Sequence, residues 1–261
     1  MLFAGPQQGG FREVLESHQG LWVHFFHIRQ IDSTCCSEAI MAEPYRILLA
    51  DDHVLVAEGI QKLLEPEFQL VGIVADGRAL VAEAAKLQPD IVVVDISLPL
   101  LNGLDASVQL KKHQPDLKII VLTMHSEQNF VTQAFRVGAS GYVLKQSVGS
   151  ELVQAIREVV KGRTFVSPMV AQSLVDQAVN KSSAATSVDA DRAFAPTLSS
   201  RQREVLQLVA EGKATKEIAS ILNVSVKTVE FHKTRIMKEL RLRTAAELTK
   251  YAIAAGLTSI H

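Results

Sequence analysis

Hydrophobic residues recur in two patterns along the middle of the chain. Short aliphatic and β-branched runs occupy 46–50, 69–74, 91–94, 118–123 and 141–144. Between and after them, apolar residues recur at helical spacing near 54–64, 78–87, 104–113, 127–137 and 151–161. Strands that are apolar on both sides and joined by helices predict a parallel sheet covered on both faces. The pattern therefore predicts an α/β fold, a five-stranded doubly wound parallel sheet over residues 44–162.

The last part of the chain, residues 198–261, carries helix signals only. Ser199 with Gln202, and Thr244 with Glu247, have the spacing of capping boxes. Between them, a short helix, a tight turn and a longer helix capped by Ser225 form the pattern of a helix-turn-helix. The sequence predicts a small all-α helix-turn-helix domain here.

Two further segments lack such patterns. After a possible helix at 168–179, the stretch 180–196 is rich in Ser, Ala and Asp, so residues 163–197 are expected to be a linker. Residues 1–43 show no caps or clean periodicity and are expected to lie outside the fold, with Met41 as a possible true start. His24 and His27 in this extension could share a helix face as metal ligands, but no spacing rule places a third ligand.

Cysteine usage and hydropathy indicate a reduced, cytoplasmic setting. The two cysteines, Cys35 and Cys36, are adjacent, where neither a disulfide nor a tetrahedral zinc site is expected. The apolar runs are far shorter than the ~18 residues of a membrane-spanning helix. We therefore expect no membrane partner.

Charge is divided unevenly between the two predicted domains. Residues 198–261 carry 11 Lys/Arg and 6 Asp/Glu, net +5, whereas the rest carries 27 − 11 = 16 basic and 28 − 6 = 22 acidic residues, net −6. A basic terminal domain suggests nucleic acid as its partner, although a helix pair made soluble by lysines would show the same charge.

The long helix of this domain has a distinct outward face. Val229, Ile236 and Leu240 recur at core spacing, and residues off that stripe point to solvent. There, Phe231 and the Thr234 methyl could meet thymine methyls and Glu230 could accept from cytosine, while the basic residues serve phosphates and His232 packs. The predicted DNA-binding residues are Lys227, Thr228, Glu230, Phe231, Lys233, Thr234 and Arg235.

Acidic residues follow two strands that should be neighbours. Asp51 and Asp52 come directly after the first strand, and Asp95 follows the third. In a sheet of order 2-1-3-4-5 these strand ends meet at the switch point where ligands bind. Crowded carboxylates need a cation, and oxygen ligands suit Mg²⁺. We therefore expect a Mg²⁺ cofactor.

Two more strand ends complete the predicted site. Thr123 closes the fourth strand and Lys145 the fifth. A carboxylate beside a metal, a hydroxyl and an ammonium can accept a phosphoryl group, and Asp95 is the expected acceptor. Each residue alone could be a helix cap or a loop residue. A purely structural role for all five residues at once is improbable.

Residues 45–161 resemble a response-regulator receiver domain, which has a flavodoxin-like fold. The matching segments are LLADDH at 48–53, VVVDISLPLLNGLDA at 92–106, VLTMHS at 121–126 and GYVLK at 141–145. The resemblance implies that Asp95 is the phosphorylation site, that Asp51 and Asp52 bind Mg²⁺ with Asp52 as a direct ligand, and that the Ser97 backbone carbonyl supplies another ligand. It also implies that Thr123 and Tyr142 form a switch pair, with Tyr142 turning inward on phosphorylation. Ser97 and His125 stand at positions that, by the same resemblance, adjust the lifetime of the phosphoryl group. Tyr142 alone would pass for ordinary half-buried packing.

The sequence departs from the commonest receiver pattern after Lys145. Gln146 stands where an acidic or small residue is frequent, and Val148 where a helix cap would help. We expect a weakened cap before Glu151, with Ser147 or Ser150 as the substitute.

The helical domain resembles the LuxR type through LSSRQREVLQLVAEG at 198–212, KEIASILNVSVKTVEFH at 216–232 and KELRLRTAAEL at 238–248. Together the two domains are similar to the NarL/FixJ response regulators. This implies a transcriptional regulator of a two-component system, not an enzyme, phosphorylated by a sensor histidine kinase. It also implies binding to promoter DNA as a homodimer paired through helix 245–255, with half-sites about a turn apart.

Two other classes of function fit part of this pattern. An aspartyl-phosphate phosphohydrolase would also use an aspartate and Mg²⁺, but usually has an acid two residues later, where this chain has Ser97. A phosphorylation-independent regulator with a vestigial receiver is disfavoured by the intact acids, threonine and lysine. Whether phosphorylation releases an interdomain contact or drives receiver dimerisation stays open.

Overall fold

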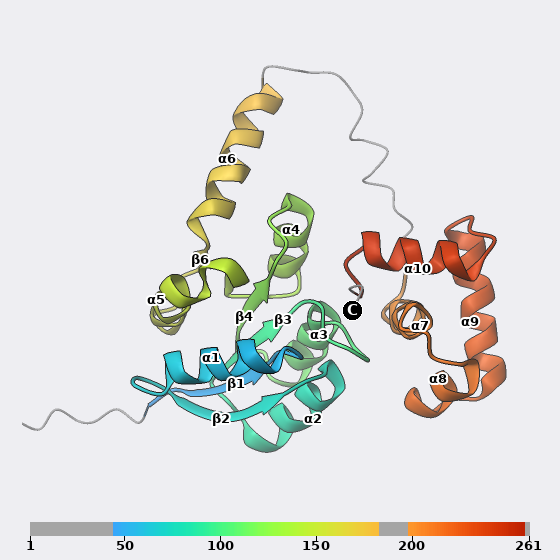
Figure 1. Ribbon diagram of the computed structural model, residues 1–261, viewed down its shortest axis with the longest axis horizontal. Coiled ribbons are helices and arrows are strands. Elements are labelled where there is room, and N and C mark those ends of the chain that lie inside the picture. The colour runs from blue at the N-terminus through green and yellow to red at the C-terminus, as the bar shows by residue number, and fades with distance from the viewer. Residues whose placement is uncertain (1–43, 183–197, 259–261) are drawn as a thin grey trace, which may run out of the picture. The chain divides into compact units, whose positions relative to one another are not determined.

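The computed structural model of the protein describes residues 44–182 and 198–258 (Figure 1). The first of these ranges, called here the α/β domain, contains one parallel sheet of order β2-β1-β3-β4-β5-β6. Its strands are β1 (Arg46–Ala50), β2 (Gln69–Val74), β3 (Ile91–Asp95), β4 (Lys118–Thr123), β5 (Gly141–Leu144) and β6 (Phe165–Val166). The predicted fold class and order are confirmed, with one strand more than expected. The expectations for residues 1–43, including His24, His27, Cys35 and Cys36, lie outside the described residues.

Helices cover both faces of this sheet. They are α1 (Val54–Leu64), α2 (Gly77–Leu87), α3 (Gly103–His113), α4 (Gln128–Arg136) and α5 (Val148–Val160). One apolar core joins α2, α3 and α4 to the sheet, and the other joins α1 and α5 to its opposite face (Figure 1). Because the β-branched runs are buried on both sides, alternate residues of each strand feed opposite cores, as a doubly wound sheet requires.

The additional strand lies in the segment expected to be a linker. Phe165 pairs with Gly141 of β5 and is only 8% exposed. The Ser167 hydroxyl accepts a hydrogen bond of 3.0 Å from the Leu144 backbone N–H and donates one to Glu151. The helix α6 (Pro168–Ser182) follows and buries Val170 completely. The possible helix at 168–179 is thus observed as α6, and β6 adds a short strand that the sequence did not predict.

The start of α5 is weakly capped. The helix begins at Val148, directly after the single 3₁₀ turn η1 (Lys145–Ser147), and Ser147 at the N-cap makes no side-chain capping bond. The Ser150 hydroxyl donates to the Ser147 carbonyl, so it does not cap the helix N–H groups either. The predicted weak cap is observed, but the expected substitution by these serines was wrong.

Residues 198–258, called here the helical domain, form α7 (Ser200–Ala210), α8 (Thr215–Ile221), α9 (Val226–Glu239) and α10 (Ala245–Ala254). Both predicted capping boxes are present, and the Ser225 hydroxyl caps α9 through the Thr228 N–H. A separate apolar core, including Val229 and Ile236, holds the helices together. None of the helices in the two described ranges is long and apolar enough to cross a membrane.

Candidate functional site

Buried charges meet at the carboxyl ends of the central strands. Asp51 directly follows β1 and Asp95 ends β3; these strands pair side by side, and the two residues are only 2% and 3% exposed. The Lys145 Nζ atom, just after β5, lies 2.8 Å from Asp51 Oδ2 and 2.7 Å from Asp95 Oδ2. The parallel sheet thus brings side chains from three distant segments into direct contact.

Burial and neighbouring charge perturb this pair of ionisable groups. Burial raises the pKa of the Asp95 carboxyl above its ordinary value, and the adjacent ammonium of Lys145 only partly opposes the rise. For Lys145, burial acts to lower the pKa, but attraction to Asp95 and Asp51 outweighs it and the pKa is raised. Additional positive charge would therefore stabilise the ionised form of Asp95, whereas Lys145 is held in its charged form.

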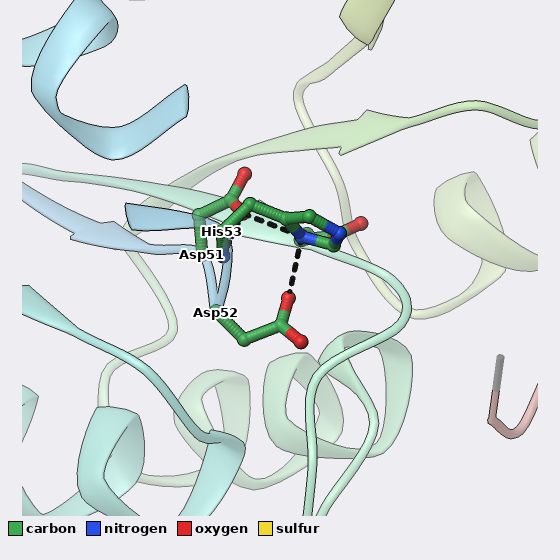
Figure 2. A group of neighbouring side chains, drawn as sticks. Asp51, Asp52 and His53 are labelled. Carbon is green, nitrogen blue, oxygen red and sulfur yellow. Dashed lines mark hydrogen bonds and ion pairs between the residues drawn. The ribbon is translucent and has the colours of Figure 1, made fainter. Parts of the chain in front are cut away.

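The acidic cluster includes a histidine. One oxygen or nitrogen atom from each of Asp51, Asp52, His53 and Asp95 lies within 4.8 Å of the others. Figure 2 shows the His53 ring turned toward both neighbouring carboxylates, with Nδ1 2.9 Å from Asp52 Oδ1 and 3.3 Å from Asp51 Oδ1. Carboxylate oxygens so close together fit the donor set and short bonds of Mg²⁺. The residues present therefore suit this ion.

Thr123 ends β4, and Tyr142 lies within the neighbouring strand β5. The Thr123 hydroxyl accepts a hydrogen bond of 3.0 Å from the His125 N–H, and the Tyr142 hydroxyl donates one of 2.9 Å to the His125 carbonyl. Burial raises the pKa of the Tyr142 phenol, so the hydroxyl stays protonated. The His125 ring stacks on Phe130 of α4 at 4.2 Å. Tyr142 is fully buried in this structure, and its turning inward on phosphorylation stays a prediction.

The loop after Asp95 packs closely against it. The Ser97 N–H lies 3.3 Å from Asp95 Oδ1; the proposed role of the Ser97 carbonyl stays a prediction. Gly103, at the start of α3, has no room for a side chain, since a Cβ there would lie 2.0 Å from the Asp95 carbonyl oxygen. The backbone of α3 therefore touches the backbone of the acidic residue.

The outward face of α9 largely matches the predicted one. Phe231 is 60% exposed and makes an edge contact with the His232 ring. Arg235 forms an ion pair of 2.7 Å with Glu239 one turn later, so part of its charge is engaged. Of the predicted set, Lys227, Glu230, Phe231, Thr234 and Arg235 are exposed, and Thr228 and Lys233 are half-buried.

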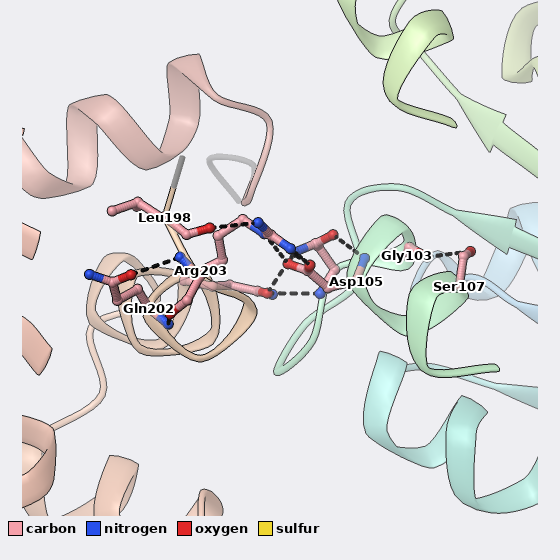
Figure 3. Close-up of polar contacts among 9 residues, drawn as sticks. Gly103, Asp105, Ser107, Leu198, Gln202 and Arg203 are labelled. Carbon is pink, nitrogen blue, oxygen red and sulfur yellow. Dashed lines mark hydrogen bonds and ion pairs between the residues drawn. The ribbon is translucent and has the colours of Figure 1, made fainter. Parts of the chain in front are cut away.

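Sequence reasoning missed two features. It gave His53 no role, although the residue directly follows the two acids in the segment LLADDH. It also missed the ion pair between Arg203 of α7 and Asp105 of α3 (Figure 3), which no spacing in the sequence signals because 98 positions separate them.

An aspartate paired with a lysine at the carboxyl ends of a doubly wound sheet, in a chain that also contains a helix-turn-helix domain, is typical of a phosphorylation-controlled DNA-binding regulator. Comparisons with known proteins agree. Residues 47–157 match the response regulator receiver domain, and residues 196–252 match the luxR family of bacterial regulatory proteins. The chain belongs to the NarL/FixJ family of two-component response regulators, which bind DNA through a LuxR-type domain.

The similar proteins align with this chain over nearly their whole length. The oxygen regulatory protein NreC of Staphylococcus carnosus is 38% identical over 217 residues, covering 81% of this chain and 98% of that protein. A structure of the RcsB response regulator of Salmonella typhimurium has a TM-score of 0.56 at 29% identity, covering 83% and 100%. RcsB from Salmonella enterica serovar Typhimurium bound to promoter P1flhDC has a TM-score of 0.51 at 30% identity, with the same coverage.

Proposed function

We propose that Asp95 is the phosphoacceptor and that a sensor histidine kinase is the donor. In this transfer the P–N bond of the donor's phosphohistidine breaks, and a P–O bond to the Asp95 carboxylate forms. The observation that carries the proposal is the 2.7 Å contact between Lys145 Nζ and Asp95 Oδ2. Charge gathers on the phosphoryl oxygens during transfer, and a fixed ammonium at this distance offsets it.

Mg²⁺ is the proposed cofactor, held by Asp51, Asp52, Asp95 and the Ser97 carbonyl. When bound, the ion supplies positive charge to the phosphoryl oxygens. Lys145 orients Asp51 and Asp95 by binding one oxygen of each. The Thr123 hydroxyl accepts a hydrogen bond from the His125 N–H, and its own proton can be donated to the phosphoryl group at the same time.

Thr123 and Tyr142 are the proposed switch. Both side chains make hydrogen bonds with the backbone of His125. A movement of Thr123 would therefore move His125, and with it the carbonyl that binds the Tyr142 hydroxyl. His125 in turn stacks on Phe130 of α4. Phosphorylation of Asp95 would then alter the surface formed by α4 and β5 through Thr123, His125 and Phe130.

The helical domain is proposed to bind promoter DNA as a homodimer, with α9 in the major groove and α10 at the dimer contact. The exposed Lys227, Phe231 and Thr234 support this assignment, and so does the RcsB complex with promoter DNA. Such a regulator acts in the cytoplasm, where its DNA is found. Because the chemistry at Asp95 modifies the protein itself, we propose a regulator and not an enzyme with a diffusible substrate.

The proposed domains are an N-terminal extension at 1–43, a receiver at 44–162, a linker and a DNA-binding domain at 198–261. Pairing of β6 with β5 supports extending the receiver at least to Val166. The linker would then follow α6.

Labelling with a small acyl phosphate tests the phosphoacceptor. With Mg²⁺ present, the wild-type protein and the control Asp116→Asn, which changes an exposed carboxylate, should both take up the label. Asp95→Asn should take up none. A label that persists on the Asp95→Asn protein would place the phosphoryl group elsewhere.

Salt dependence tests the DNA assignment. Affinity should fall steeply as salt rises, because phosphate contacts release counterions. Lys227→Ala and Lys233→Ala should each weaken binding to all sequences alike and reduce the salt slope by about one. Salt-insensitive binding would contradict these contacts.

A further inference from the structure

His53 turns its ring toward two carboxylates of the acidic cluster (Figure 2). The Nδ1 atom lies 2.9 Å from Asp52 Oδ1 and 3.3 Å from Asp51 Oδ1. Around an ion with bonds of about 2.0–2.2 Å, neighbouring ligand atoms are about 3.0–3.4 Å apart. The ring nitrogen therefore stands, relative to each of these oxygens, at nearly the spacing of two ligands of one ion.

The backbone presents this ring to the acids. The His53 N–H donates a hydrogen bond of 2.9 Å to Asp51 Oδ1. His53 is also the N-cap residue of α1, but its side chain makes no capping hydrogen bond there. The side chain is 50% exposed, whereas the Asp51 carboxylate is buried. The imidazole thus does not serve the start of α1, and an ion arriving from solvent can reach it.

Lys145 contacts the other side of the same carboxylate. Its Nζ atom lies 2.8 Å from Asp51 Oδ2, while His53 approaches Oδ1. An ion on the His53 side therefore does not have to displace the ammonium from Asp51. No ligand atom of the cluster is more than 4.8 Å from another, so small side-chain rotations would bring four ligands to one ion: Asp51, Asp52, His53 and Asp95.

A nitrogen ligand changes the class of ion that the cluster suits. Mg²⁺ takes oxygen ligands in an octahedral arrangement and usually keeps several waters. Zn²⁺ accepts imidazole together with carboxylates, and a zinc ion with four protein ligands has a closed tetrahedral shell. Such an ion leaves no position for a phosphoryl oxygen, and its bond to Asp95 would engage the carboxylate that must attack phosphorus. The two ions would therefore have opposite effects on Asp95.

We propose that His53 makes the acidic cluster a binding site for Zn²⁺, with Nδ1 as the nitrogen ligand, and that Zn²⁺ bound there excludes Mg²⁺ and blocks phosphorylation of Asp95. The zinc site stands on the placement of His53, whereas the block rests on the proposed function of Asp95. Because one cluster holds either ion, each ion lowers the apparent affinity for the other by mass action. Phosphorylation then depends on the ratio of the two ions.

Zinc affinity at constant pH tests the nitrogen ligand. The full chain carries Cys35→Ser and Cys36→Ser in every sample, which removes its two thiols. In this parent, His53→Gln should weaken Zn²⁺ binding about tenfold and change Mg²⁺ affinity by less than about twofold. His113→Gln is the matched control, because His113 is an exposed histidine at the end of α3. Equal Zn²⁺ affinities in the two variants would overturn the zinc site.

The ring nitrogen also gives a direct signal. In nitrogen-15 spectra, the His53 resonances are those missing from the His53→Gln protein. Saturating Zn²⁺ should shift the Nδ1 resonance of His53, and Mg²⁺ should displace the Zn²⁺ and restore it. An Nδ1 resonance that does not respond to Zn²⁺ would overturn His53 as a ligand.

Asp52→Asn tests whether the two ions share one site. Because Asp52 is a proposed ligand of both, the variant should bind Mg²⁺ and Zn²⁺ more weakly than the parent. A variant that loses Mg²⁺ but binds Zn²⁺ as tightly as the parent would place zinc elsewhere. If the parent binds Zn²⁺ through His53 but binds no Mg²⁺, the proposed cofactor fails and the zinc site stands.

Acyl-phosphate labelling at fixed Mg²⁺ tests the block. Each protein is compared with its own rate before Zn²⁺ is added. Zn²⁺ should suppress labelling of the parent and the His113→Gln control, and His53→Gln should need about tenfold more Zn²⁺ for the same suppression. Undiminished labelling of the parent at saturating Zn²⁺ would overturn the block. If the parent takes up no label even without Zn²⁺, the role of Asp95 fails, and the binding and nitrogen-15 measurements alone decide the zinc site.

Discussion

The ammonium of Lys145 lies 2.7 Å from Oδ2 of Asp95, and the same nitrogen lies 2.8 Å from Asp51. Asp52 belongs to the same cluster, so three carboxylates lie together with one lysine and the half-exposed His53. Such a cluster is short of positive charge, which is the property that a cation-dependent phosphoacceptor needs. The same lack of positive charge should lower the free energy of unfolding when no cation is bound.

Replacing Lys145 by methionine removes the charge and keeps most of the volume. Two buried carboxylates then lose their ion-pair partner, so the free energy of unfolding at neutral pH should fall by about 3 kcal/mol. Urea denaturation without divalent ions measures it. Lys62→Met is the control, because Lys62 pairs with Glu65 at the surface and such pairs contribute little. Equal effects of the two substitutions would contradict a tightly coupled buried cluster.

Replacing Asp95 by asparagine should stabilise the ion-free protein at neutral pH. Burial raises the folded-state pKa of Asp95 above its unfolded value, so ionised Asp95 costs folding free energy at pH 7, and asparagine carries no such cost. The asparagine variant should therefore have the higher urea midpoint at pH 7. The gain should vanish as the pH falls below about 3.9, where the carboxyl is protonated in both states.

Urea denaturation at pH 7 and at pH 3 in the presence of a chelator measures this difference. Saturating Mg²⁺ should reverse the order at pH 7, because the ion stabilises the wild-type protein by binding its folded state. An asparagine variant less stable than wild type at pH 7 without Mg²⁺ would show that Lys145 overcompensates the burial of Asp95.

Two glycines in helices should respond oppositely to alanine. At Gly103 a Cβ would lie 2.0 Å from the Asp95 carbonyl oxygen, so Gly103→Ala should displace the backbone at the site and cost about 2 kcal/mol or more. At Gly59 in α1 a Cβ meets nothing within 4 Å, so Gly59→Ala should stabilise the protein by about 0.5–1 kcal/mol. Urea midpoints measure both, and acyl-phosphate labelling should be impaired only in Gly103→Ala. A stabilised Gly103→Ala protein would contradict the close approach.

The first five strands and the acidic site at their ends were predictable because each of these strands is a short apolar run, and most of them end at or just before a polar residue. The runs at 91–94 and 118–123 are apolar and β-branched, and the polar residues Asp95 and Thr123 come at their ends. The strand β6 was not predictable, since Phe165 and Val166 alone are too short to show any period and gain their place only from pairing with β5.

Contacts between distant segments were also beyond prediction. Gln207 and Arg203 occupy ordinary positions of an amphipathic helix, and a glutamine at such a position carries no sign that its amide will satisfy the backbone of residues 98 and 102. The same is true of Tyr142, whose hydroxyl finds its partner in a single carbonyl, that of His125. Periodicity predicts which face of an element is buried, but it does not identify the partner.

Phe231 offers the sharpest test of the DNA-binding surface. Its side chain is 60% exposed, so Phe231→Ala should change the free energy of unfolding by less than about 0.5 kcal/mol. If the ring contacts thymine methyls, the affinity for the preferred site should fall about tenfold, while the affinity for unrelated duplexes stays the same. Competition binding at constant salt measures both.

Ile236 on the same helix is the matched control. It is 1% exposed, so Ile236→Ala should cost about 2–5 kcal/mol of stability through the cavity that it leaves. Its effect on DNA binding should then follow the fraction of folded domain and be the same for all sequences. If Phe231→Ala also weakened preferred and unrelated duplexes equally, the ring would not be reading bases, and the sequence preference of α9 would have to come from Glu230 and Thr234.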